Sequence, residues 1–235
     1  MTRRLALLAS APLLLGGCGA VDEPDASPSP TPSAARSSTA AATPTPAEQA
    51  TEDTTRDSGP TASDGRPRDA SLRIERLGLR DVEVVAYRGR TDDARGTEIQ
   101  NGGVAASPHG PEGGTGPGGI GNYQVTAHRL SAGGLFRELP RLRRGDEVSV
   151  RAGGTTYVYE IRRTRITSFR EPQSLREQRA AVPGRPGVEA DRAWLTLSTC
   201  RTIEDHAEGN YWSDEFDNPE HRIDKIGVLV RVERA

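Results

Sequence analysis

Cys200 and His128 are the two residues of this chain best placed to do covalent chemistry. Cys200 follows the apolar run Trp194–Thr199 and comes directly before a polar stretch, so it lies where a strand is expected to reach the surface. His128 holds the same kind of position after Val125-Thr126-Ala127. A thiol needs a neighbouring base or imidazolium to be reactive near neutral pH, and histidine supplies either. The two residues predict a nucleophilic cysteine assisted by a histidine.

The other three histidines lie in less suitable surroundings. His109 belongs to a stretch rich in glycine and proline, and His206 and His221 belong to an acidic stretch that follows Cys200. Two simpler interpretations stay open from the residues alone. His128 could be a structural histidine, and Cys200 could be a buried small hydrophobe.

Short apolar or alternating runs predict the strands that would position these residues. They are 82–85, 123–127, 147–150, 156–161, 194–198 and 226–230. Gly134–Leu139 and Ser174–Arg179 can each form a turn or two of helix, and Pro140 and Pro183 limit their length. Many short strands separated by turn signals predict a mainly β domain that closes into a β-barrel.

Gly102–Gly121 contains nine glycines and three prolines. Such a composition predicts a surface loop that leads into the strand ending at Ala127.

The chain divides by composition into three parts. Residues 1–18 carry Arg3, Arg4 and a leucine-rich run that is too short to span a bilayer, which is typical of a secretory signal peptide. In residues 19–68, Ala, Pro, Ser and Thr supply 33 of 50 positions, so this part predicts a disordered tether. Residues 69–235 form the expected folded domain.

Overall composition narrows the function classes. The chain has 235 residues, 27% of them charged, two cysteines and a formal net charge of −2. These values exclude a polytopic membrane protein, a disulfide-built mini-domain and a basic nucleic-acid binder.

Thr196-Leu197-Ser198-Thr199-Cys200 contains the pattern TLxTC. This pattern is similar to the signature of the sortases, the bacterial cysteine transpeptidases. Gly121 to Arg129 resembles the segment that carries their catalytic histidine, and Gly134 to Asp146 resembles the short helix and turn that come next. The similarity runs from about Arg73 to Val232 and is greatest to the actinobacterial class E type.

This resemblance implies a set of site residues. Cys200 would be the nucleophile, His128 the general acid, and Thr199 of the signature a substrate-binding residue. Sortases also carry an arginine at the start of the last barrel strand, which matches Arg222. Arg201 is the competing candidate, because it directly follows the nucleophile.

The implied reaction is an amide exchange. The Cys200 thiolate attacks the threonine carbonyl of a C-terminal sorting motif, LAxTG or LPxTG, and His128 protonates the departing glycine amine. A thioester then persists until an amine of a cell-wall precursor or a pilin takes the acyl group. No cofactor or metal is expected. The partners are secreted proteins that bear the motif.

The sequence Leu15-Gly16-Gly17-Cys18 resembles a bacterial lipobox, in which the cysteine is acylated and becomes the new N-terminus. We therefore expect Cys18 to be lipidated and the domain to be held at the outer face of the cytoplasmic membrane. This departs from the usual transmembrane anchor of sortases. An ordinary cleaved signal is the alternative.

The stretch from Cys200 to Arg222 is long and acidic and includes Tyr211, Trp212 and Phe216. Part of it could cover the cleft as a lid. Calcium binding is an alternative use of its carboxylates, but it lacks EF-hand spacing, so a solvated loop is the favoured interpretation.

Two other function classes compete with the sortase interpretation. A surface lipoprotein with a β-barrel binding module would keep Cys200 buried and unreactive. An L,D-transpeptidase would need a glycine directly before the cysteine, where this chain has Thr199.

Overall fold

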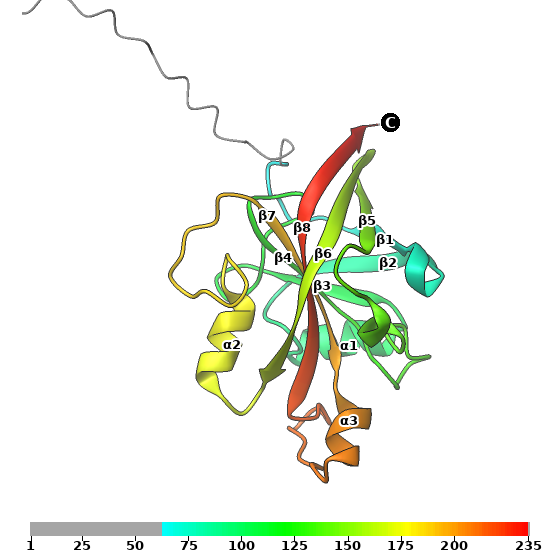
Figure 1. Cartoon of the computed structure of the whole chain (residues 1–235), viewed down its shortest axis with the longest axis vertical. Helices are drawn as coiled ribbons and strands as arrows, with labels where there is room; N and C mark the ends of the chain where they lie inside the picture. The colour runs from blue at the N-terminus through cyan, green and yellow to red at the C-terminus, as the bar shows by residue number, and fades with distance from the viewer. Residues whose placement is uncertain (1–62, 235) are drawn as a thin grey trace, which may run out of the picture. The chain divides into compact units, whose positions relative to one another are not determined.

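The computed structural model describes residues 63–234, and within them eight strands close a barrel (Figure 1). The strands are β1 Ala70–Ile74, β2 Leu79–Arg88, β3 Ala105–His109, β4 Gly121–Thr126, β5 Glu147–Ala152, β6 Thr155–Ser168, β7 Ala193–Cys200 and β8 His221–Arg234. Their order around the barrel is β1, β2, β3, β4, β7, β8, β6, β5, and β5 pairs with β1. The predicted mainly β barrel is confirmed, and all six expected strands lie in it, with Ala127 one residue past the end of β4.

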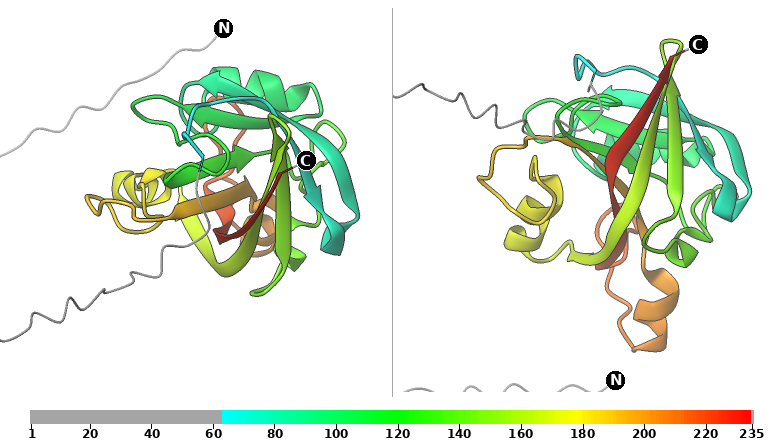
Figure 2. Two further views of the ribbon diagram at one scale, coloured as in Figure 1. Left: turned by 90° about the horizontal axis from the view of Figure 1, so that it is seen from above. Right: turned by 45° about the horizontal axis from the view of Figure 1, so that its top comes forward.

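Three short α-helices and two 3₁₀ turns lie outside the barrel wall (Figures 1 and 2). They are η1 Glu75–Leu77, α1 Ala94–Asn101, η2 Leu139–Arg141, α2 Pro172–Arg179 and α3 Thr202–Ala207. The helix expected at Ser174–Arg179 is confirmed as α2. The one expected at Gly134–Leu139 is wrong, because Gly133 and Gly134 both have positive φ and the segment forms turns until η2 begins.

The expectation of a surface loop for Gly102–Gly121 is also wrong in part. Ala105–His109 form β3, a buried strand that pairs in parallel with β2. Further along, Gly116–Gly119 are buried as well. A Cβ on Gly116 would lie 2.0 Å from the carbonyl oxygen of Arg66, so glycine is required there for close approach of two backbones.

Strands β4 and β7 are buried on both faces. Inward-facing Leu195 and Leu197 belong to the apolar core, together with Val125 of β4. The opposite face carries polar side chains, which α2 covers: Gln178 of α2 donates to Ser198 and Asp224, and Asn122 donates to the Gln178 carbonyl. This covered polar face leads along β7 to Cys200.

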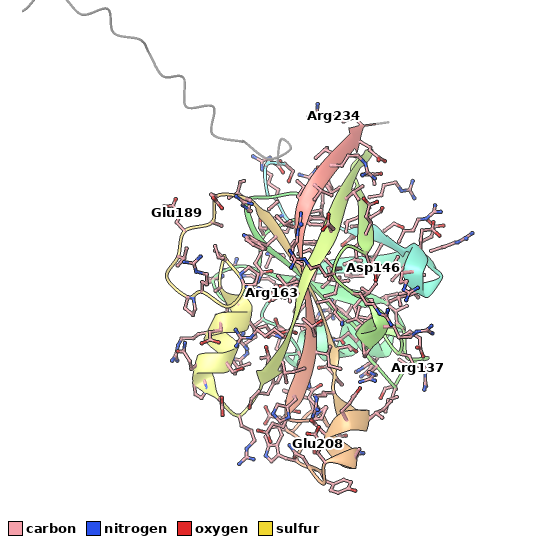
Figure 3. The ribbon with its side chains drawn as sticks, viewed as in Figure 1. Arg137, Asp146, Arg163, Glu189, Glu208 and Arg234 are labelled. Carbon is pink, nitrogen blue, oxygen red and sulfur yellow. The ribbon has the colours of Figure 1, made fainter. Side chains whose placement is uncertain are left out.

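Charged side chains cover the outside of the barrel, as the labelled Arg137, Glu189 and Arg234 illustrate (Figure 3). Of the residues that the structure describes, none belongs to a helix long and apolar enough to cross a membrane.

The expected signal peptide, Cys18 and the expected tether up to residue 62 lie outside the described residues. Residues 63–68, which composition assigns to the tether, pack on the barrel. Ser63 Oγ donates to the Pro117 carbonyl at 2.6 Å, and the Gly116 amide donates to the Gly65 carbonyl at 2.8 Å. The described domain therefore includes residues 63–68, so the predicted boundary at residue 69 is six residues too late.

Candidate active site

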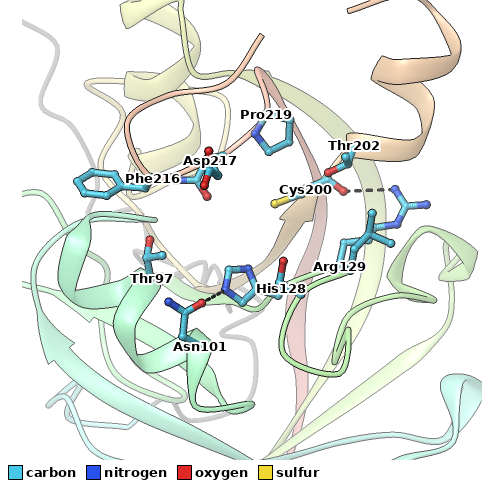
Figure 4. A pocket seen from close by; sticks show the side chains of 12 residues that line it. Thr97, Asn101, His128, Arg129, Cys200, Thr202, Phe216, Asp217 and Pro219 are labelled. Atoms are coloured by element: carbon cyan, nitrogen blue, oxygen red, sulfur yellow. Dashed lines mark hydrogen bonds between the residues drawn. The ribbon is translucent and has the colours of Figure 1, made fainter. Parts of the chain in front are cut away.

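A cavity of about 280 Å³ opens at the ends of β4 and β7, and both Cys200 and His128 line it (Figure 4). Its walls come from α1, from the segment after β4, and from residues 216–219 before β8. The lining residues are Thr97, Asn101, His128, Arg129, Leu130, Ser131, Cys200, Thr202, Phe216, Asp217, Asn218 and Pro219.

Parallel pairing of β4 and β7 brings the two reactive side chains together. Thr126 pairs with Ser198, so His128 and Cys200 each come two residues later at the same edge of the sheet. The Ala127 amide donates to the Ser198 carbonyl at 3.3 Å and extends the pairing toward His128. The pairing thus brings His128 next to Cys200, although the two residues are 72 positions apart in the sequence.

His128 is oriented by Asn101 at the end of α1. Its Nε2 lies 2.8 Å from the Asn101 side-chain oxygen (Figure 4). Since that oxygen accepts a hydrogen bond, Nε2 carries the proton and Nδ1 is left as the free nitrogen. Burial lowers the pKa of His128, the negative charge of Asp92 opposes this shift, and the positive charge of Arg222 adds to it.

Burial acts on the thiol in the opposite direction. It raises the pKa of Cys200, and the nearby Arg222 guanidinium counteracts part of that shift. Both groups are therefore uncharged at neutral pH in the resting site. Within residues 63–234 the thiol makes no hydrogen bond to the imidazole, although both line the same cavity.

Arg222 lies directly across from Cys200, because the two residues pair between β7 and β8. No part of its side chain is exposed. Nε donates to Asp92 at 2.8 Å, Nη1 donates to the Pro219 carbonyl at 2.8 Å, and the guanidinium stacks on Phe169 at 4.0 Å. Nη2 is buried without a partner among the described side chains, so one donor of this guanidinium is unused.

Arg201, the competing arginine, faces α3 instead. It donates to Asp205 at 2.7 Å and to Glu208 at 2.8 Å. The structure thus separates the two candidates: Arg222, not Arg201, pairs with Cys200 across β7 and β8, although Arg222 does not line the cavity.

Thr199 is not placed where a substrate contact was expected. It is 2% exposed, it does not line the cavity, and its hydroxyl donates to the Ala127 carbonyl at 2.8 Å. The alternation of side chains along β7 explains this, since neighbours of Cys200 point to the other face. The hydroxyl ties β7 to the residue before His128.

Arg129 is a site residue that sequence reasoning did not identify. Its guanidinium bonds both oxygens of Glu204 at 2.6 and 3.0 Å and also donates to the Cys200 carbonyl at 3.3 Å. It therefore joins α3 to both strand ends. Its position directly after His128 was the available signal.

The sequence also did not reveal Asn101 and Asp92. Asn101 ends α1 and contacts His128 only in the folded structure. The run Thr91-Asp92-Asp93 is typical of a helix start, and Asp93 does cap α1 by accepting from the Gly96 amide at 2.8 Å. Since one aspartate suffices for the cap, the presence of Asp92 beside it was the only sign of a further role.

Four of the seven carboxylates of the acidic stretch are held by arginine or histidine. Glu204 pairs with Arg129, Asp205 with Arg201 and His221, Glu208 with Arg201, and Glu220 with Arg170. Across residues 63–234 no three His, Cys, Asp or Glu side chains are grouped so that they could hold a metal ion. Three aromatic residues of the acidic stretch are candidates for a lid. Phe216 lines the cavity, whereas Tyr211 stacks with His206 and Trp212 packs against Arg170.

Comparison with known proteins gives this site a family. A family model described as the sortase domain matches residues 72–212, which include His128 and Cys200 and end before Arg222. No curated protein matches the sequence.

Solved sortases share the fold. The SrtA sortase from Actinomyces oris is 18% identical, with a TM-score of 0.55 over 76% of this chain and 89% of that one. A sortase E variant from Streptomyces avermitilis is 24% identical, with a TM-score of 0.51 over 72% and 91%. Sortase E1 from Streptomyces coelicolor is 21% identical, with a TM-score of 0.50 over 74% and 94%. With the family model matching more than half of its length, the chain belongs to the sortase family of cysteine transpeptidases.

Proposed function

We propose that Cys200 is the nucleophile and His128 the general acid of a transpeptidation at a C-terminal sorting motif. The observation that carries this proposal is the convergence of both side chains on one cavity at the ends of β4 and β7. The L,D-transpeptidase alternative is set aside by the family match, and a binding module with a core thiol does not fit a cysteine that lines a cavity.

Acylation begins with the uncharged pair. The thiol proton moves to Nδ1 of His128, and the resulting thiolate attacks the threonine carbonyl, so that an S–C bond forms. When the C–N bond to glycine breaks, the imidazolium returns its proton to the departing amine. Asn101 keeps the ring in the tautomer that leaves Nδ1 free for this transfer.

Arg222 supplies charge stabilisation in this scheme. Its unused Nη2 donor is the group available to a substrate carbonyl or to the tetrahedral oxyanion. Pro219 lines the cavity and holds the guanidinium through its carbonyl, so the 216–219 segment must yield when substrate enters. This segment is the part of the acidic stretch that acts as the lid.

An amine of a cell-wall precursor or a pilin then attacks the thioester and releases Cys200. The class E resemblance favours the LAxTG form of the motif. The proposed Cys18 lipid would hold this domain outside the cytoplasmic membrane, where such substrates are exported.

The proposal is tested with the chain 18–235 carrying Cys18→Ser, which leaves Cys200 as the only thiol. It is incubated with LAxTG and LPxTG peptides and a glycine amine, and products are identified by mass. We expect a product in which the peptide up to its threonine is joined to the glycine amine. More of it should form from LAxTG than from LPxTG, and none should form with the Cys200→Ala control. If neither peptide gives product while Cys200 of the native protein is still alkylated at alkaline pH, the proposed motif is contradicted. If native Cys200 is not alkylated even there, catalysis is contradicted.

A further inference from the structure

We propose that Asp92 is a positioning residue for Arg222 and the counter-charge of the active site. The inference rests on the proposed function, since it assigns Asp92 a role in the same reaction. Asp92 lies in the loop between β2 and α1, more than a hundred residues before the arginine it holds.

The contact is a buried ion pair. Asp92 Oδ2 accepts from Arg222 Nε at 2.8 Å, and its other oxygen, Oδ1, accepts from Gln100 Nε2 at 2.8 Å. The Asp92 side chain is 6% exposed and the Arg222 side chain is not exposed at all. Both carboxylate oxygens are therefore engaged, and the carboxylate has one orientation relative to α1.

The backbone around Asp92 is fixed as firmly as its side chain. Its φ of +54° lies in the left-handed region, which a non-glycine residue adopts at a cost. Flanking contacts hold it there: Thr91 donates to Gln124 of β4 at 2.7 Å, and Tyr87 donates to the Arg90 carbonyl at 2.6 Å. The loop is thus fixed by a hydrogen bond to β4, the strand that leads to His128.

These contacts decide which donor of Arg222 is free. Asp92 takes Nε and Pro219 takes Nη1, while Phe169 covers one face of the guanidinium. Rotation about the last side-chain bonds would break the Asp92 contact. Nη2 is consequently presented in one direction, as a preorganised donor must be.

Asp92 also acts by its charge on both reacting groups. Its negative charge raises the pKa of His128 and raises the pKa of Cys200, against opposite effects of Arg222 on each. Among the described residues, Asp214 also raises the pKa of the thiol, and the charge of Asp92 also raises the pKa of Tyr87 on β2 and of Arg179 on α2. Removing the charge therefore shifts both titrations to lower pH.

Three variants separate geometry from charge. Asp92→Asn removes the charge and keeps the shape, and Asp92→Glu keeps the charge and displaces the guanidinium. Asp93→Asn is the matched control, because it removes the adjacent charge while asparagine still caps α1. Each is compared with wild type in peptide turnover against pH, in Cys200 alkylation against pH and in thermal unfolding.

We expect kcat to fall about 10- to 100-fold in both Asp92 variants, as for a misplaced catalytic donor. In Asp92→Asn both limbs of the pH profile and the alkylation midpoint move to lower pH. In Asp92→Glu they stay at wild-type positions, and Asp93→Asn behaves as wild type. If Asp92→Asn does not fold, the kcat loss with unchanged limbs in Asp92→Glu carries the test.

A rise in kcat would overturn the proposal, because it would mean that Asp92 masks Arg222. Unmoved limbs in a folded Asp92→Asn would overturn the counter-charge role. If wild type fails to turn over any peptide, the proposed function fails separately, and the alkylation midpoints of the variants still decide whether Asp92 sets the charge of the site.

Discussion

At the residue scale, burial controls the protonation of the site. The pKa of Cys200 is raised and that of His128 lowered, in each case chiefly by burial. The thiolate–imidazolium pair holds as many protons as the uncharged pair. The ratio of the two forms therefore does not change with pH, and the charged form is present as a minor species between the pKa of His128 and the pKa of Cys200.

This arrangement predicts a broad bell-shaped pH profile for peptide turnover. The acid limb falls below the ordinary histidine pKa of about 6.5 and the basic limb lies above the ordinary cysteine pKa of about 8.5. Alkylation of Cys200 by iodoacetamide should follow the upper limb. An alkylation midpoint below about pH 7 would show a preformed ion pair and contradict the account.

Arg222→Lys tests the guanidinium apart from its charge. Lysine keeps a positive charge, but its single nitrogen cannot occupy at once the three positions that Nε, Nη1 and Nη2 hold beside Asp92, Pro219 and the site. We expect kcat/KM to fall about 10²- to 10³-fold, the loss typical of one oxyanion donor. Arg222→Ala should in addition raise the alkylation midpoint, because the positive charge lowers the thiol pKa. Near-normal kcat/KM in both variants would remove Arg222 from the mechanism.

Site residues differed in how far the sequence could reveal them. Cys200 and His128 were predictable because each follows an apolar run that must be a strand. Asp92 and Asn101 were not, since their roles depend on a loop and a helix end that fold back across the sheet. The substrate-binding role predicted for Thr199 did not follow from its position next to Cys200, because adjacent strand residues point to opposite faces of the sheet.

At the scale of elements, parallel pairing of β4 with β7 is what turns two distant residues into one site. Alternating runs predicted both strands, but β3 contains a proline and small residues and gave no strand signal. Its burial comes from packing between β2 and β4, a tertiary effect that local propensity does not encode.

Helix α3 is held to the site by Arg129 and Glu204. Glu204→Ala should lower the free energy of unfolding by about 1 kcal/mol, at the low end for charge-assisted bonds because Glu204 is 35% exposed. The hydrogen bonds from Arg129 lower the pKa of Glu204, so the contribution is present above the ordinary glutamate pKa of about 4.3 and is lost as pH falls through the lowered value.

Urea unfolding of wild type and Glu204→Ala, at pH 7 and at a pH below the lowered pKa of Glu204, measures the difference in the free energy of unfolding. Glu208→Ala is the matched control, since Glu208 pairs with Arg201 at an exposed position and little change is expected. Equal effects of the two variants at every pH would show that the Arg129 pair does not hold α3.

At the scale of the whole molecule, the sequence predicts an anchor, a tether and a domain, of which the structure describes the domain together with its first contacts at residues 63–68. With residues 63–68 in the domain, the expected tether is residues 19–62, and a flexible chain of about 44 residues has an end-to-end distance of roughly 35 Å, which suits a domain working just outside a membrane.

Cys18→Ser tests the proposed lipid anchor. The variant should leave the membrane fraction and appear in the soluble or secreted fraction, because the acyl chains would be absent. Wild type and Cys200→Ser, which alters only the other cysteine, serve as controls. Unchanged membrane fractionation of Cys18→Ser would contradict lipidation.

The central claim is that Cys200 carries the acyl group, and intact-mass spectrometry tests it most directly. The chain 18–235 with Cys18→Ser is mixed with a sorting-motif peptide without an amine acceptor, beside Cys200→Ala and His128→Gln. We predict an added mass equal to the peptide that ends at threonine less one water, as a thioester requires, removed by hydroxylamine and absent from Cys200→Ala. A slower adduct is expected in His128→Gln, by about 10²- to 10⁴-fold. An adduct that persists in Cys200→Ala would contradict the account.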